Sequence, residues 1–198
     1  MVVEETGLGN VLFEDKIRFV DLNYDDLFDV SNQTGFNALP KLTFPATLKK
    51  VDWIVSVAKM KTHHWAGVTL SMKNLFGVMP GSVYGWPKNL LHYHGISQSI
   101  VDINATLKPH FAIVDGITGM QGDGPIMGES IHPGVLVMGR SLPAVDATCC
   151  RIMGIDPHKI DYLRVANNQI GTIVGRDIHQ RGEMISEVYT PFKLAPQS

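Results

Sequence analysis

The sequence has no aspartate or glutamate between Trp53 and Val101, although acids are frequent in the rest of the chain. The charged residues of this stretch are all lysines: Lys59, Lys61, Lys73 and Lys88. The stretch is also rich in histidine and glycine and follows an apolar run, so its positive charges have no counter-ion within the segment. We therefore expect a site here for an anion or a metal ion.

Other absences narrow the class of protein. Cysteine occurs only as the adjacent pair Cys149 and Cys150, so the chain has no disulfide framework and no ligand spacing for zinc or an iron–sulfur cluster. No apolar run approaches the roughly 18 residues of a membrane helix, and the N-terminus is acidic rather than a basic leader. The formal charge of −2 gives no electrostatic basis for nucleic-acid binding. We expect a cytoplasmic chain without membrane or nucleic-acid partners.

The composition is that of an ordinary globular protein: 198 residues, 44% apolar and 18% charged, enough for one domain with a core. Predicted strands alternate with predicted helices along the chain. The strands are 16–22, 51–58, 110–115, 134–139 and an edge strand at 183–194; the helices are 25–30, 68–77, 96–107, 143–153 and 157–167. This alternation predicts an α/β fold with a largely parallel sheet flanked by helices in three layers.

The first residues have the pattern of a helix end without a helix start, since 2–8 form a final turn closed by a glycine. We therefore expect 1–198 to be a single α/β domain that forms the C-terminal part of a longer family domain.

Two loops follow predicted strands and carry most of the unusual residues. Lys59–His64 follows the strand over 51–58, and the glycine-rich loop over 115–128 follows the strand over 110–115. Because ligands of α/β sheets bind outside the carboxyl ends of the strands, we expect these loops to share a crevice.

Lysine, histidine and acid side chains supply the candidate catalytic groups: Lys61, His63, Lys73 and Asp115. An ammonium group can hold an anionic substrate or, when desolvated, act as nucleophile or base, and a carboxylate can transfer protons. The alternative for Lys73 is a solvated position on a helix.

Histidines supply the candidate metal ligands. His63 and His94 are the preferred pair for a divalent metal, because adjacent histidines seldom bind one ion. The alternative is that His64 and His92 face solvent and that His94 caps a helix at Gly95.

The loop over 119–128 can bring backbone N–H groups close to an anion. The candidate cofactor contacts are Asn74, Gly122, Asp123 and Gly124. The loop matches neither the Walker A pattern nor the Rossmann fingerprint, so a lid or a plain turn is the alternative.

Several segments occur in an order typical of one family: VDWIVSVAKMKTH, SMKNLFGVMPG, His94, IVDGITGMQGDGP and PAVDATCCRIMGIDP. From about Leu48 to Gly182 the chain resembles the domain of unknown function 362 family, whose members occur alone or fused to ferredoxin-type iron–sulfur modules. The resemblance implies a ferredoxin-type iron–sulfur protein as partner. The chain lacks ferredoxin cysteines, so no iron–sulfur cluster is expected in it. It also lacks the N-terminal lysine–asparagine motif of the family.

The segment HHWAGVTLSMKNLFGVMPG also resembles part of the nickel-pincer lactate racemases. The matching positions are His63, Ala66-Gly67, Lys73, Pro80-Gly81, and His92 or His94. The resemblance implies that the lysine tethers the cofactor, the first histidine is an acid/base and the later histidine binds nickel. Thr69 and Ser71 replace glycines of that family, and the spacing to the last histidine is longer.

Together these features predict a site at the strand ends that binds an anion or a metal, in an enzyme acting on a small anionic substrate. The alternative is a non-catalytic module that binds a ligand or an iron–sulfur partner.

Overall fold

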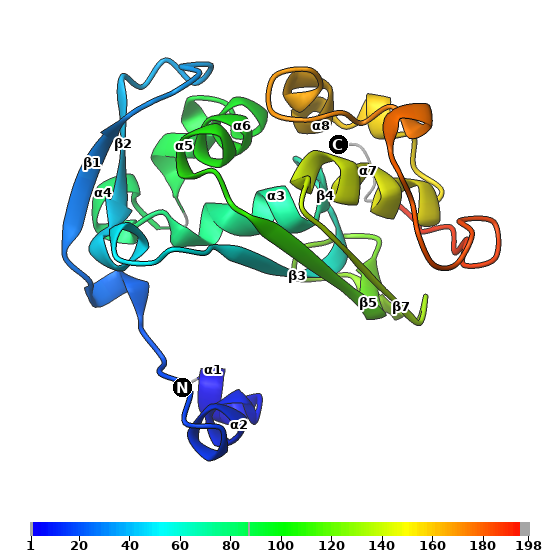
Figure 1. Ribbon diagram of the computed structural model, residues 1–198, viewed down its shortest axis with the longest axis horizontal. Helices are drawn as coiled ribbons and strands as arrows, with labels where there is room; N and C mark the ends of the chain where they lie inside the picture. Colours follow the sequence, from blue (N-terminus) through cyan, green and yellow to red (C-terminus); the bar gives the residue numbers. More distant parts are fainter. Residues whose placement is uncertain (1, 87, 195–198) are drawn as a thin grey trace.

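The computed structural model describes residues 2–86 and 88–194 (Figure 1). Its main sheet has five strands: β3 (Val55–His63), β4 (Gly67–Thr69), β5 (Phe111–Gln121), β6 (Glu129–Ile131) and β7 (Val135–Gly139). The order is β4-β3-β5-β6, with β7 also paired to β5. Only β3 and β5 run parallel among these pairs. The α/β class is therefore confirmed, whereas the sheet is mixed rather than largely parallel.

Helices lie on one side of this sheet (Figure 1). They are α3 (Ser71–Asn74), α6 (Ile96–Leu107) and α7 (Leu142–Ile152), with α8 (Asp161–Ala166) packed against α6 and α7. Successive side chains of β3 point to opposite faces of the sheet, and Ser56, Ala58 and Met60 are buried on the face that packs against the helices. The apolar core lies between this face and the helices.

The other face of the sheet is open in the described part of the chain. Val57 is 62% exposed and Ile117 56% exposed, and Leu136 and Met138 of β7 are exposed beside them. The predicted three-layer arrangement is thus not confirmed. The apolar run of β3 indicated burial on both faces, but periodicity cannot reveal whether a second layer of helices is present.

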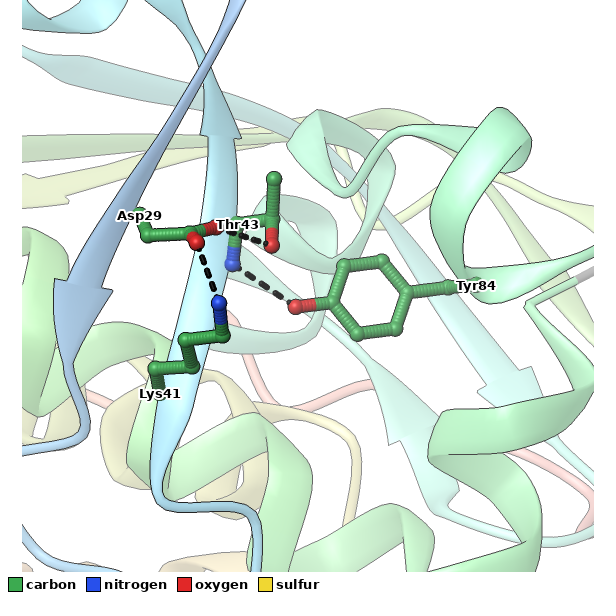
Figure 2. A network of polar contacts seen from close by, with 4 residues as sticks. All are labelled: Asp29, Lys41, Thr43 and Tyr84. Atoms are coloured by element: carbon green, nitrogen blue, oxygen red, sulfur yellow. Dashed lines mark hydrogen bonds and ion pairs between the residues drawn. The ribbon is translucent and has the colours of Figure 1, made fainter.

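A separate hairpin, β1 (Leu27–Ser31) and β2 (Lys41–Pro45), is attached to α4 (Gly81–Tyr84). Figure 2 shows the link: Asp29 accepts hydrogen bonds from Lys41 and from the Thr43 hydroxyl, and the Thr43 N–H donates to the Tyr84 hydroxyl at 2.7 Å. The predicted helix over 25–30 is therefore wrong. Its alternating exposed and half-buried residues are those of a strand.

The remaining elements are short. They are α1 (Val2–Glu5), α2 (Leu8–Glu14), α5 (Asn89–Tyr93) and the 3-10 turns Leu22–Tyr24, Ala46–Lys49, Leu75–Val78, Pro157–Lys159 and Gly175–Asp177. The predicted helix over 68–77 is divided among β4, α3 and a 3-10 turn, and the one over 157–167 begins as a 3-10 turn. The predicted strands over 16–22 and 183–194 are wrong, because those described residues form no strand. None of the described helices has the length and apolar character needed to cross a membrane.

Candidate functional site

The two predicted loops are largely strand, because β3 extends to His63 and β5 extends to Gln121. The C-terminal ends of β3 and β5 and the residues that follow them lie against each other. The Thr62 hydroxyl donates to the Gly122 carbonyl at 2.8 Å, and the backbone N–H of His64 donates to the Gly124 carbonyl at 3.1 Å. A Cβ atom on Gly124 would lie 2.1 Å from the Thr62 carbonyl oxygen, so only glycine permits this approach. The parallel pairing of β3 and β5 thus places the glycine-rich loop against the histidine pair.

His63 is buried, with 7% of its surface exposed. Its Nδ1 atom accepts hydrogen bonds from the backbone N–H groups of Trp65 (3.1 Å) and Ala66 (3.2 Å). Burial first, and then the charge of Lys73, lower the pKa of His63 to about 3. The ring is therefore neutral near pH 7 and carries its proton on Nε2, which makes it a hydrogen-bond donor on that side.

This protonation pattern bears on the predicted metal and nickel sites. A histidine that binds a metal through one nitrogen normally donates a hydrogen from the other, but Nδ1 of His63 accepts two hydrogen bonds. His63 therefore does not fit a metal or a nickel cofactor in this conformation. Within residues 2–86 and 88–194, no group of three or more His, Cys, Asp or Glu side chains is arranged to hold a metal.

Lys73 lies on α3 with its Nζ atom 4.7 Å from the centre of the Phe76 ring. Burial first, and then the nearby charge of Lys61, lower the pKa of Lys73 to about 8. No carboxylate of the described chain forms an ion pair with Lys61 or Lys73. The side chain of Lys73 is thus mostly buried, whereas the alternative prediction placed it in solvent.

Lys61 stands opposite Thr69 in the β3–β4 pair, so the two side chains share a face of the sheet. The Thr69 hydroxyl is buried and has no hydrogen-bond partner within the described chain. A buried hydroxyl without a partner is uncommon, and it indicates a place for a ligand group or a water molecule. No pattern in the sequence distinguishes Thr69 from Thr62, whose hydroxyl donates to the Gly122 carbonyl.

His92, rather than His94, completes the group. Its ring packs edge-on against Phe76 (5.2 Å) and Trp65 (5.3 Å), and its Nδ1–H donates to the Lys88 carbonyl at 2.9 Å. The ring of His94 instead packs against Tyr93 at the C-terminal end of α5. We call Lys61, His63, Lys73 and His92 the cationic cluster, after its two lysines. Burial, and then the charges of Lys73, His64, His92 and Lys61, lower the pKa of His63, so the imidazole of His63 is a neutral member of the cluster.

Two of the three remaining predicted residues, Asp115 and Asn74, have structural partners. Asp115 pairs with Lys59 at 2.6 Å, and this contact lowers the pKa of its carboxyl group, which suits an ion pair better than an acid catalyst. Asn74 donates to the Ser56 hydroxyl and the Val57 carbonyl, both at 3.1 Å, and so fastens α3 to β3. Asp123 is exposed between the glycines that contact β3.

Asp146 of α7 links this helix to α3 and to α8. This fully buried carboxylate accepts hydrogen bonds from the Ser71 N–H (2.8 Å) and hydroxyl (2.5 Å), the Met72 N–H (3.1 Å) and the Tyr162 hydroxyl (3.1 Å). It therefore caps α3 from α7 and fixes the turn that carries Lys73. An acid inside the apolar helix sequence LPAVDATCC was the available signal. Burial raises the pKa of Asp146 to about 6.

Comparisons with known proteins agree with the resemblance found in the sequence. The family described as "Domain of unknown function (DUF362)" matches residues 1–151, so the match begins before Leu48 and ends before Gly182. A thylakoid-associated protein of Synechocystis sp. is 28% identical over 122 residues, which are 61% of this chain and 38% of that protein. The chain thus covers less than half of this relative's length. No solved structure matches the chain. With about three quarters of its length matched, the chain belongs to the DUF362 family.

Proposed function

We propose that the chain binds a small anionic molecule, a carboxylate or a phosphate, at the cationic cluster. The observation that supports this is a group of lysine and histidine side chains held together without any carboxylate of the described chain beside them. Like charges at close range repel each other. The attraction of each cation to a bound anion would offset that repulsion. The histidine-rich turn and α3 would then form the two sides of the site.

The hydrogen-bonding groups of the cluster suit an oxyanion. Neutral His63 has an N–H on Nε2, Lys73 has an ammonium group, and Thr69 has a hydroxyl without a partner in the described chain. Hydrogen bonds from a cation to an oxyanion are stronger than neutral ones, so Lys73 is expected to contribute most of the affinity.

The protonation of Lys73 also supports an enzymatic role. A lysine with a pKa of about 8 exists as both ammonium and amine near neutral pH, as a general base requires. We propose that Lys73 exchanges a proton with the bound anion, a reaction that calls for no metal at His63. Binding without proton exchange would favour the alternative, a non-catalytic binding module. A ferredoxin-type partner stays a prediction.

Calorimetric titration with inorganic phosphate and with lactate tests the binding step. Lys73→Met is expected to weaken binding about tenfold or more, because a hydrogen bond to a charged group contributes about 1.5–3 kcal/mol. Lys159→Met removes an exposed lysine and is the matched control. Equal affinity of the two variants for both anions would contradict the proposal.

The pH dependence of binding gives a second test. The ammonium form of Lys73 is lost as the pH rises through about 8, so the affinity should fall above that pH in the wild type. Lys73→Met should show a flat profile over the same range. Loss of the proton at C2 of lactate in deuterated buffer, followed by NMR, then separates an enzyme from a binding module.

A further inference from the structure

A cavity of about 790 Å³ lies along the free edge of β7, and all its lining residues follow the cationic cluster in the sequence. β7 pairs with β5 on one side, and no other described strand pairs with it. The cavity is bounded by β7, by α7 and by the irregular segment over 172–188. Its volume is within the range of small-molecule and peptide sites, about 300–1,000 Å³.

Helix α7 extends over this cavity beyond the edge of the sheet. It rests on β7, since a Cβ on Gly139 would lie 3.0 Å from the Val145 side chain. Ala144, Thr148 and Ile152, spaced four residues apart on one face of α7, line the cavity. The helix layer therefore offers an apolar roof to a chain segment placed beside β7.

The edge of β7 lacks two features that usually prevent the pairing of an edge strand. Its sequence, VLVMG, contains no charge and no proline. Alternate residues of an edge strand direct their N–H and C=O groups away from the sheet. In the described chain, no backbone hydrogen bond outside the sheet satisfies these groups of β7. The cavity is thus bordered by a row of unused donors and acceptors.

The charges at the mouth of the cavity specify the partner further. Asp177 is already paired with Arg176 at 3.8 Å. Arg140, directly after β7, and Arg181 have no ion-pair partner in the described chain, and Glu183 is the remaining acid of the lining. Two unpaired guanidinium groups against one carboxylate favour a partner that carries an acid.

We propose that β7 binds an extended peptide segment of a partner protein as an added strand. The segment has alternating apolar side chains, which enter the cavity under α7, and a carboxylate at the end that meets Arg140. Main-chain hydrogen bonds supply affinity, and the cavity supplies selectivity for the apolar side chains. This site shares no residue with the cationic cluster.

A labelled seven-residue peptide of alternating valine and threonine, with a glutamate at each end, is the probe. Fluorescence anisotropy should show saturable one-to-one binding, and hydrogen exchange should show slower exchange of the β7 amides in the complex. The same peptide N-methylated at alternate residues cannot pair along one edge, and it should bind about tenfold or more weakly because several hydrogen bonds of about 1 kcal/mol are lost. This comparison needs no protein variant.

Ala144→Phe, which places a ring in the cavity, should reduce binding, and Lys73→Met should leave it unchanged. Three results would each overturn the proposal: no binding of the unmethylated peptide, equal binding of the N-methylated peptide, or unchanged exchange of the β7 amides at saturation. Failure of anion binding at the cationic cluster would leave all three measurements unaffected.

Discussion

The two ends of the short helix α3 hold two opposite electrostatic arrangements. At its start, the buried Asp146 carboxylate is met by four hydrogen-bond donations from Ser71, Met72 and Tyr162. Two residues later, the Lys73 ammonium lies over an aromatic ring, with the charge of Lys61 nearby and no carboxylate of the described chain paired to it.

A structural charge and a functional one differ in the groups that surround them. The cost of burying Asp146 is offset in part inside the protein, because each carboxylate oxygen accepts two hydrogen bonds, although burial still raises the pKa of Asp146 to about 6. The cost of crowding Lys73 is offset by nothing in the described chain, so an external anion is the group that completes the arrangement. Four substitutions test this comparison, and they follow in order of decreasing expected effect.

Asp146→Ala should have the largest effect, because it leaves two backbone N–H groups and the Tyr162 hydroxyl buried without an acceptor. We expect the free energy of unfolding to fall by about 3 kcal/mol or more. Asp146→Asn keeps the shape and one acceptor oxygen, so it should lose less. Urea denaturation measures both, and equal, small losses would show that the carboxylate is dispensable.

Gly124→Ala should have the next largest effect. The added methyl group would lie 2.1 Å from the Thr62 carbonyl oxygen, so the glycine-rich loop must move away from the histidine pair. We expect about 1–3 kcal/mol of lost stability, as for other overpacked positions. Gly77→Ala is the control, because a Cβ there meets nothing within 4 Å. The idea fails if the two variants unfold at the same urea concentration.

The pH dependence of folding separates the two ends of α3. His63 has its pKa lowered to about 3, so the unfolded state binds more protons between pH 6.5 and 3 and stability falls as the pH falls through this window. Asp146 has its pKa raised to about 6, so the folded state binds more protons between pH 6 and 3.8, and its contribution rises as the pH falls.

The two contributions oppose each other between about pH 4 and pH 6, at up to about 1.4 kcal/mol per pH unit each. His63→Gln removes one of them, so the loss of stability on acidification should become smaller or reverse. Urea midpoints from pH 4 to pH 7 measure this, with His158→Gln as a surface control. An unchanged slope in His63→Gln would falsify the assignment of a neutral, buried imidazole.

Lys59→Met should have the smallest effect. The Lys59–Asp115 pair is largely exposed, and exposed ion pairs contribute at most about 1 kcal/mol. We expect unfolding free energy to change by less than that and anion binding to stay the same. A loss of anion affinity in this variant would move the site from the cationic cluster toward Asp115.

Local patterns predicted two helices and one strand of the fold closely. The helix over 96–107, the helix over 143–153 and the strand over 134–139 were found at those positions or within a residue of them, because their periodicity matches their packing. β1 was missed because LFDVS is too short for its two-residue alternation to be distinguished from other patterns.

The composition of the site segment was visible in the sequence, but its geometry was not. The absence of acids drew attention to Lys61, His63 and Lys73, which the structure does bring together. The choice of His94 over His92 depended on which side of α5 faces Trp65, and α5 has too few residues for periodicity to show it. The partner of Asp115 lies on the neighbouring strand, so no local pattern contains it.

The open face of the sheet has a practical consequence for stability measurements. Val57, Ile117, Leu136 and Met138 expose apolar surface on the folded chain. Environment-sensitive dyes such as anilinonaphthalene sulfonate report unfolding by binding apolar surface of this kind. The native protein is expected to bind the dye as well, so thermal stability of this chain should be followed by circular dichroism rather than by dye fluorescence.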